Sequence, residues 1–257
     1  MTELPDFRRF DVFAGDNALG NPAAVITLET FPEALAMQEI AVKLAMPATA
    51  FVELSGQRIR WFSPAREIAL CGHGALAAGA AMMERGGSAE VSFRLADGRE
   101  LRVRRMADTS CYEVALPALE TAPASLPGLA EALGIEPAEM RWNAAGYALV
   151  VVELPAAVRT LSPDRAKLKA LGNWQVSVSA RSDQAGADIV SRVFSGGGIE
   201  DAATGSAHAA MATYWAAKLS SNEITAFQAS ERGGRLRCRV DGQHVWIGGL
   251  VRAQRSG

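Results

Sequence analysis

The sequence predicts an α+β protein built from two similar halves, each a curved sheet wrapped around one long helix. Residues 58–75 and 190–207 repeat the same features in the same order: a strand-like run ending in Phe-Ser, a turn, and a Glu followed five residues later by a Gly. Each segment then enters an Ala-rich, helix-favouring stretch, Gly74–Arg85 and Ala207–Leu219. The offset of 205 − 72 = 133 residues is about half of the 257-residue chain. Chance similarity of short Ala/Gly-rich segments is the alternative, but the shared order of elements favours duplication.

Shorter runs complete the two halves as strands. They alternate in polarity or are rich in β-branched and aromatic residues, and they cover residues 7–13, 23–26, 97–103, 147–152 and 233–238. Because Ala and Gly make a thin helix, strands can approach such a helix closely and wrap around it. Long strand-only runs around a single helix disfavour the alternative of a doubly wound fold.

The segment from Pro117 to Pro127 marks the join between the halves, because its prolines interrupt any regular pattern. A short helix is predicted just after it, at 129–133. The predicted domains are therefore an N-terminal lobe, 1–117, and a C-terminal lobe, 118–257. A pseudo-twofold relation between them would place an active site in the cleft between the lobes.

Composition excludes several classes of function. A net charge of −2 and a pI near 6.0 leave no basic surplus for nucleic-acid phosphates. The local arginine clusters alternate with apolar residues and are interpreted as solvated strand faces; they are Arg102/Arg104 and Arg235/Arg237/Arg239. Three widely spaced cysteines without a CxxC pair suggest neither disulfides nor a metal site. The polar first ten residues and the lack of a bilayer-length apolar run lead us to expect a soluble, cytoplasmic protein without a membrane partner.

The starts of the two long helices hold the residues that can carry chemistry. The first helix begins at Cys71-Gly72-His73-Gly74, and the second begins in the segment from Asp201 to Ser206, which includes Thr204 and Gly205. Free backbone N–H groups and the positive end of the dipole make helix N-termini anion sites, and glycine lets a ligand approach the backbone. If both ends face one cleft, they would hold a small carboxylate beside an acid/base pair, His73 and Asp201.

Simpler structural explanations exist for each candidate: a helix cap for Thr204 and Ser206, a turn hydrogen bond for His73 or Asp201, and a buried small apolar side chain for Cys71. His208 and His244 lack companions and are interpreted as structural or surface residues. The pairing of similar residues across the two halves is what favours a functional role for His73, Asp201 and Ser206.

Several motifs, in order and nearly end to end, resemble the PhzF-like family of phenazine biosynthesis isomerases, relatives of diaminopimelate epimerase and proline racemase. They are Phe10-Asp11-Val12-Phe13, Gly20-Asn21-Pro22-Ala23-Ala24-Val25, Glu67-Ile68-Ala69-Leu70-Cys71-Gly72-His73, Glu200-Asp201-Ala202-Ala203-Thr204-Gly205-Ser206-Ala207-His208, Tyr214-Trp215-Ala216, Gln228-Ala229-Ser230-Glu231-Arg232-Gly233-Gly234-Arg235-Leu236 and Gly248-Gly249. The resemblance implies two lobes, each a barrel-like, mostly antiparallel sheet around a central helix. It also implies proton transfer on a small carboxylate without a cofactor, in a homodimer. His73, Asp201 and Ser206 then match active-site positions, with Gly72, Gly74, Thr204, Gly205 and Asn21 as substrate contacts.

Two departures from the family pattern affect this expectation. The typical Ser-Glu-Thr-x-Phe-Val, which supplies a proton-shuttling Glu, here reads Pro47-Ala48-Thr49-Ala50-Phe51-Val52, so that Ala48 stands in place of the Glu. Glu53 lies five residues further on and would face the opposite side of a strand. The epimerase relatives use a cysteine at each helix start, and here Cys71 matches the first position whereas Ala202 occupies the second.

Three functions remain open after this comparison. The first is a PhzF-like isomerase that uses Asp201 and His73 as acid and base. The second is an epimerase or racemase that depends on Cys71. The third is a metabolite-binding protein that has lost catalysis because Ala48 replaces the family's Glu.

Overall fold

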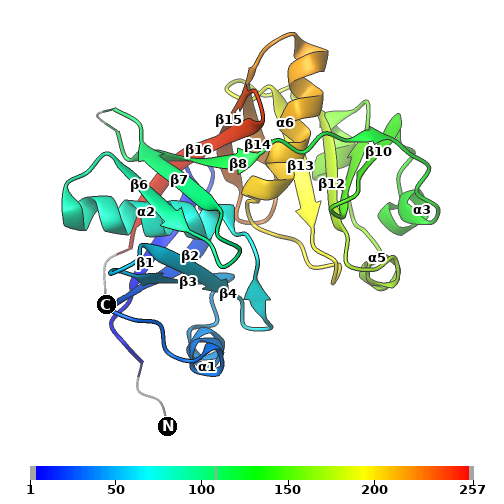
Figure 1. The fold of residues 1–257 in the computed structure, drawn as a ribbon. Coiled ribbons are helices and arrows are strands. Elements are labelled where there is room, and N and C mark those ends of the chain that lie inside the picture. Colours follow the sequence, from blue (N-terminus) through cyan, green and yellow to red (C-terminus); the bar gives the residue numbers. More distant parts are fainter. Residues whose placement is uncertain (1–3, 108, 255–257) are drawn as a thin grey trace. The chain divides into compact units, whose positions relative to one another are not determined.

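A computed structural model describes residues 4–107 and 109–254, and the chain divides into two compact units. Within the described residues, the N-terminal unit runs to Ala115 and also includes Gly248 to Gln254; the C-terminal unit comprises Leu116–Ile247. Strand β8 (Cys111–Pro117) and strand β16 (His244–Ala253) each contribute residues to both units. Figure 1 follows the chain through its elements, from blue to red.

In the N-terminal unit, strands surround one buried helix. Its elements are β1 (Arg8–Ala14), β2 (Asn21–Leu28), α1 (Ala34–Leu44), β3 (Ala48–Glu53), β4 (Arg58–Phe62), β5 (Glu67–Ile68), α2 (Gly72–Gly86), β6 (Glu90–Arg94), β7 (Glu100–Arg105), and parts of β8 and β16. Hydrogen bonding runs in the order β1-β2-β3-β4-β6-β7-β8-β16, and β16 pairs with β1, so the strands close into a barrel.

Helix α2 contacts strands β1, β2, β3, β6 and β7 of this barrel. All its residues from Gly72 to Ala81 are buried, as expected for a helix that is apolar on every side. A Cβ added to Gly79 would lie 2.5 Å from Cγ1 of Val103 on β7, so only glycine allows this close approach. The small residues that predicted a wrapped helix are therefore required by its packing.

The C-terminal unit repeats this plan around helix α6. Its elements are β9 (Ala122–Pro123), α3 (Leu129–Leu133), β10 (Glu139–Asn143), β11 (Tyr147–Val151), α4 (Pro155–Arg159), α5 (Arg165–Ala170), β12 (Gln175–Arg181), β13 (Ile189–Phe194), α6 (Gly205–Leu219), β14 (Glu223–Gln228), β15 (Gly234–Asp241) and the start of β16. Helix α6 contacts β11, β12, β14 and β15.

Strand pairing follows the same series in the two units. From β1 to β7 successive pairs are antiparallel (β1–β2), parallel (β2–β3), antiparallel (β3–β4), parallel (β4–β6) and antiparallel (β6–β7). From β10 to β15 the pairs β10–β11, β11–β12, β12–β13, β13–β14 and β14–β15 follow the same series. The central helix follows the fourth strand of each series, and antiparallel pairs outnumber parallel ones, as expected.

The structure departs from the predicted fold in two respects. The last strand returns to the N-terminal unit, where Val12 pairs with Val251, whereas we assigned 118–257 to the second lobe. Each half also holds more helices than predicted: α1 packs on the other face of β3 and β4, and α4 and α5 join the predicted α3 in the C-terminal unit. These helices are short or weakly patterned, and tertiary packing stabilises them.

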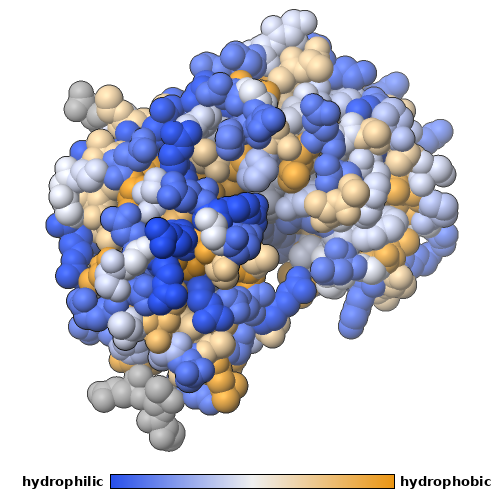
Figure 2. Space-filling model, in the orientation of Figure 1, coloured by the Kyte–Doolittle hydropathy of each residue, from blue (hydrophilic) through white to orange (hydrophobic). Residues whose placement is uncertain are grey.

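Surface patterning agrees with the interpretation of the arginine clusters. Along β7, Leu101 and Val103 are buried and Arg102 is exposed; along β15, Leu236 and Cys238 are buried and Arg237 is exposed. Figure 2 shows hydrophilic residues gathered over the region of β6 and β7. Among the described residues, no helix has both the length and the apolar character needed to cross a membrane.

Candidate active site

A bidentate Arg–Glu pair holds the turn before the central helix in each unit. Arg60 on β4 donates to Glu67 through Nε and Nη2, each at 2.7 Å. Arg192 on β13 donates to Glu200 in the same way, at 2.6 and 2.8 Å. Each guanidinium also lies over the ring two residues on, Phe62 at 5.3 Å and Phe194 at 5.4 Å. The repeated Glu therefore ties the turn back to its own strand and so positions the helix start.

At the start of α2, a cysteine and a histidine are in contact. Cys71 is the N-cap residue, with extended backbone, and its Sγ lies 3.5 Å from Nδ1 of His73. Their exposed fractions are 6% and 8%, and Gly72 forms the first residue of the helix. A thiol beside an imidazole is an arrangement that can exchange a proton or form a thiolate.

Gly74 lies where a side chain would not fit. A Cβ there would be 2.7 Å from Cδ1 of Trp61 and 3.1 Å from Sγ of Cys71. The close packing of Trp61 is by itself a reason for glycine at this position, alongside the predicted role as a substrate contact.

At the start of α6, the candidate residues form a closed hydrogen-bond network. The Thr204 hydroxyl donates to Oδ2 of Asp201 at 2.6 Å, and the Thr204 N–H donates to Oε1 of Gln228 at 2.9 Å. The Gln228 amide in turn donates to the Asp201 carbonyl at 2.6 Å. The Ser206 hydroxyl donates to Oε1 of Gln175 at 3.1 Å. The network holds the Asp201 carboxylate at the helix start.

Neither hydroxyl caps α6, contrary to the simpler explanation of these residues. Thr204 occupies the N-cap position, but its hydroxyl makes no bond to the helix backbone and donates to Asp201 instead. Ser206 is the second residue of the helix, because α6 begins at Gly205. Gln228 and Gln175 accept hydrogen bonds from Thr204 and Ser206 at this turn. The sequence does not predict these partners, because they lie 24 and 31 residues away along the chain.

His208 is structural, one of the two roles expected for it. The ring is fully buried; Nδ1 donates to the Thr204 carbonyl at 2.7 Å, and Nε2 accepts from the Ser191 hydroxyl at 3.1 Å. Desolvation lowers the pKa of His208 to about 4, against a smaller raising effect of the bond to Thr204. The ring is therefore neutral at pH 7. His244 lies exposed on β16.

On the N-terminal side, Asn21 and Ala48 share a face of the barrel. Ala23 pairs with Ala48, and alternation places Asn21, two residues earlier, on the same side. Both Asn21 and Ala48 are fully buried. Glu53 faces the other side, as predicted. There Arg58 binds it through two nitrogens and lowers its pKa.

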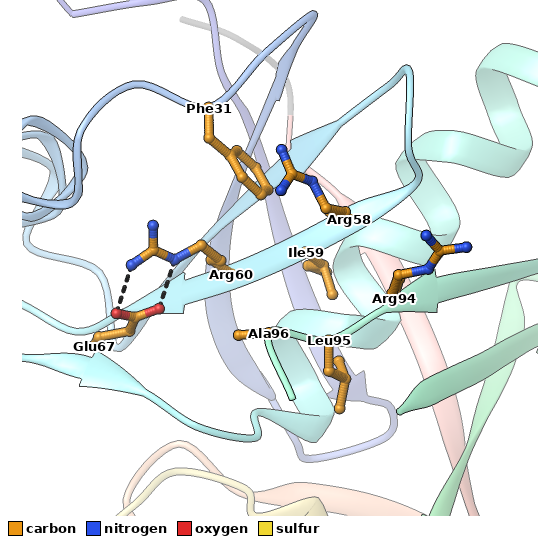
Figure 3. A pocket seen from close by; sticks show the side chains of 8 residues that line it. All are labelled: Phe31, Arg58, Ile59, Arg60, Glu67, Arg94, Leu95 and Ala96. Carbon is orange, nitrogen blue, oxygen red and sulfur yellow. Dashed lines mark hydrogen bonds and ion pairs between the residues drawn. The ribbon is translucent and has the colours of Figure 1, made fainter. Parts of the chain in front are cut away.

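Two cavities lie apart from these residues. One, of about 400 Å³, opens over β4 and is lined by Phe31, Arg58, Ile59, Arg60, Glu67, Arg94, Leu95 and Ala96 (Figure 3). The other, of about 320 Å³, belongs to the C-terminal unit and is lined by Glu120, Thr121, Arg141, Thr213, Tyr214, Ala217 and Lys218. In the described parts of the chain, none of the site residues predicted from sequence lines either cavity. Figure 3 shows Arg60 turned toward Glu67, its partner at the turn.

The predicted site residues therefore form two sets, each brought together within its own unit. The N-terminal set is Asn21, Ala48, Cys71, Gly72, His73 and Gly74. The C-terminal set is Asp201, Thr204, Gly205 and Ser206. Only the residues at the two helix starts, Cys71–Gly74 and Thr204–Ser206, occupy corresponding positions of the repeat.

A duplicated α+β fold with polar groups at the start of each central helix defines the class of this protein. The chain belongs to the family of phenazine biosynthesis-like proteins, whose pattern matches residues 10–250. It is 40% identical to an uncharacterized isomerase of Pseudomonas aeruginosa, over 96% of this chain and 95% of that one. A second uncharacterized isomerase, from Halalkalibacterium halodurans, is 32% identical over 92% and 91% of the two chains.

Solved structures agree with this assignment. A PhzF-family protein of Enterococcus faecalis superposes with a TM-score of 0.86 at 34% identity, covering 97% of this chain and 96% of the other. A phenazine biosynthesis PhzC/PhzF protein of Clostridium difficile gives 0.87 at 30% identity, covering 98% and 97%. A probable proline racemase from Agrobacterium radiobacter, 12% identical with a TM-score of 0.60 and coverage of 98% and 93%, shares the fold. The protein is therefore a member of a PhzF-like isomerase family.

Proposed function

We propose that the protein is a cofactor-independent isomerase that moves a proton between carbon positions of a small carboxylate. The observation that supports this most directly is the Asp201 carboxylate, which accepts a hydrogen bond from the N-cap residue Thr204 at the start of α6. Helix starts offer backbone N–H donors and a positive dipole end to a carboxylate. The backbone at Gly72 and Gly205 would bind the anion.

The chemistry needs one base and one acid. Asp201 would accept the proton that leaves the substrate carbon, and His73 would deliver a proton to the carbon that gains one. No net charge or electron is transferred, so the reaction needs no redox partner. Removal of a positioned acid or base lowers the rate by about 10²- to 10⁴-fold.

Exchange into D₂O tests this proposal. Purified protein would be incubated with a panel of small carboxylates, including trans-4-hydroxy-L-proline, which a structural neighbour from Agrobacterium vitis holds bound. Proton NMR then reports which carbon gains deuterium and whether the double bond or the stereocentre moves. We expect Asp201→Asn to abolish exchange and Cys71→Ala to preserve it. A substrate turned over equally by wild type and Asp201→Asn contradicts the assignment.

A second candidate is supported by the 3.5 Å contact between Cys71 Sγ and His73 Nδ1. In this case Cys71 is the base of an epimerase or racemase, and its thiolate is stabilised by the imidazolium and the helix start. Cys71→Ala then abolishes exchange, and iodoacetamide modifies Cys71 rapidly unless substrate protects it. Cys238 is an internal control, because burial raises the pKa of its thiol to about 12.

Tight binding of a carboxylate without any exchange would support the third function, a metabolite-binding protein. The homodimer implied by the resemblance is part of this proposal, and light scattering after size-exclusion chromatography measures it.

A further inference from the structure

A buried tryptophan lies against the first turn of α2. Trp61, on β4, is 2% exposed and pairs with Ala50, on the face of β3 that also carries Ala48. The Cδ1–Nε1 edge of its indole faces the helix start: a Cβ on Gly74 would lie 2.7 Å from Cδ1 and 3.0 Å from Nε1.

Its indole nitrogen has no hydrogen-bond partner among residues 4–107 and 109–254. Indole N–H is a donor only, and buried tryptophans normally find an acceptor. Trp215 on α6 follows the rule, because its Nε1 donates to the Ser179 hydroxyl at 2.8 Å. A buried donor without a partner therefore marks a place where a missing acceptor belongs.

The surroundings specify the chemistry of that acceptor. Ala48 and Ala50, on the same face of the neighbouring strand β3, carry methyl groups, which accept no hydrogen bond. The N-terminus of the 15-residue helix α2 favours negative charge. Gly72 and Gly74 add no side-chain acceptor, and Trp61 and Cys71 pack against the space beside Gly74. The acceptor that suits all three features is an anionic oxygen.

We propose that Trp61 is a substrate-recognition residue, whose indole N–H donates to a carboxylate oxygen of the ligand bound at the start of α2. This inference rests on the proposed function for the existence of a carboxylate ligand, but it assigns a contact that the motifs do not contain. Trp61 selects among ligands by position: the carboxylate must reach β4 as well as the helix backbone.

Indole NMR tests the contact directly. The chain has five tryptophans, and Trp61→Phe identifies the Trp61 signal in a ¹H–¹⁵N spectrum by its loss. Titration with trans-4-hydroxy-L-proline, carbonate and acetate should move the Trp61 indole proton downfield, while the Trp215 signal stays in place. A Trp61 signal that stays in place at saturation, or no binding of any of these three carboxylates to the wild type, overturns the inference.

Calorimetry provides the matched comparison. Trp61→Phe replaces the indole with a smaller phenyl ring and removes the donor, so carboxylate affinity should fall about 10-fold or more, and Tm checks that the variant is folded despite the cavity. Trp215→Phe removes a bonded donor and should lower Tm without changing the affinity. Equal carboxylate affinity in wild type and Trp61→Phe overturns this inference but leaves the proposed isomerase untouched. Carboxylate binding that depends on Trp61, without deuterium exchange, supports the inference and overturns the proposed isomerase.

Discussion

The two helix starts occupy equivalent positions in the repeat, but their polar groups are used differently. At α6, Asp201, Thr204 and Gln228 bond to one another, and Ser206 bonds to Gln175. At α2, the Trp61 donor has no acceptor in the described part of the chain, and Ala48 supplies only a methyl group. The same backbone plan thus presents a prearranged carboxylate in one unit and an unused donor in the other. The shared strand pairing therefore does not determine the chemistry at the helix starts, which depends on the side chains placed there.

The largest effect is expected from a carboxylate placed on the N-terminal side. If the rest of the site is competent, Ala48→Glu should raise activity on the phenazine precursor that family members process by about 10²- to 10⁴-fold. Ala48 is fully buried, so Ala48→Gln, which has the same size without the acid, controls for misfolding. Equal activity in both variants would show that the added carboxylate moves no proton.

The closed network at α6 predicts the largest loss of stability. Gln228→Met keeps the side-chain volume but removes the hydrogen bonds of Gln228 to the Thr204 N–H and to the Asp201 carbonyl. The free energy of unfolding should fall by about 3 kcal/mol. Gln175→Met removes only the partly buried bond from Ser206 and should cost about 1 kcal/mol. Urea unfolding measures both variants. Similar losses would mean that the network adds nothing beyond single bonds.

His208 makes the stability of the protein depend on pH. The pKa of His208 in the folded protein is about 4, below the ordinary value of 6.5. As pH falls, His208 therefore becomes protonated in the unfolded chain at a higher pH than in the folded protein, which favours unfolding. The contribution of neutral His208 to the free energy of unfolding is fully present above about pH 6.5. It falls by about 2 to 3 kcal/mol as the pH is lowered toward 4. Urea midpoints at pH 7.5 and 5 should differ less in His208→Gln than in the wild type. An unchanged difference would assign the acid sensitivity to other groups.

The two Arg–Glu pairs should contribute by slightly different amounts to the stability of the protein. Arg192 and Glu200 have side-chain exposures of 13% and 18%, against 24% and 40% for Arg60 and Glu67. Because solvent weakens exposed pairs, Glu200→Gln should cost about 1 to 2 kcal/mol and Glu67→Gln less than about 1 kcal/mol. Thermal unfolding of the two variants measures the difference. A larger loss for Glu67→Gln would contradict this ranking.

The repeat of elements, the two central helices and the polar residues at their starts could all be predicted from the sequence. These features are local, because a strand ending in Phe-Ser, a Glu–Gly spacing and a run of small residues can be recognised within 20 residues. The family follows from the same motifs in order. Helix α3 was predicted at its observed bounds, Leu129–Leu133.

Which distant groups meet depends on long-range packing, which is visible only in the folded protein. The pairing of Val12 with Val251 returned the last strand to the first unit, and Gln228 reached Thr204 across 24 residues. Glu67 and Glu200 were visible as a repeat, but their arginine partners were not. Trp61 resembled an ordinary core residue of a strand until its indole edge was seen against Gly74. Local patterns report which face of an element is buried, whereas hydrogen-bond partners depend on long-range packing that no local period encodes.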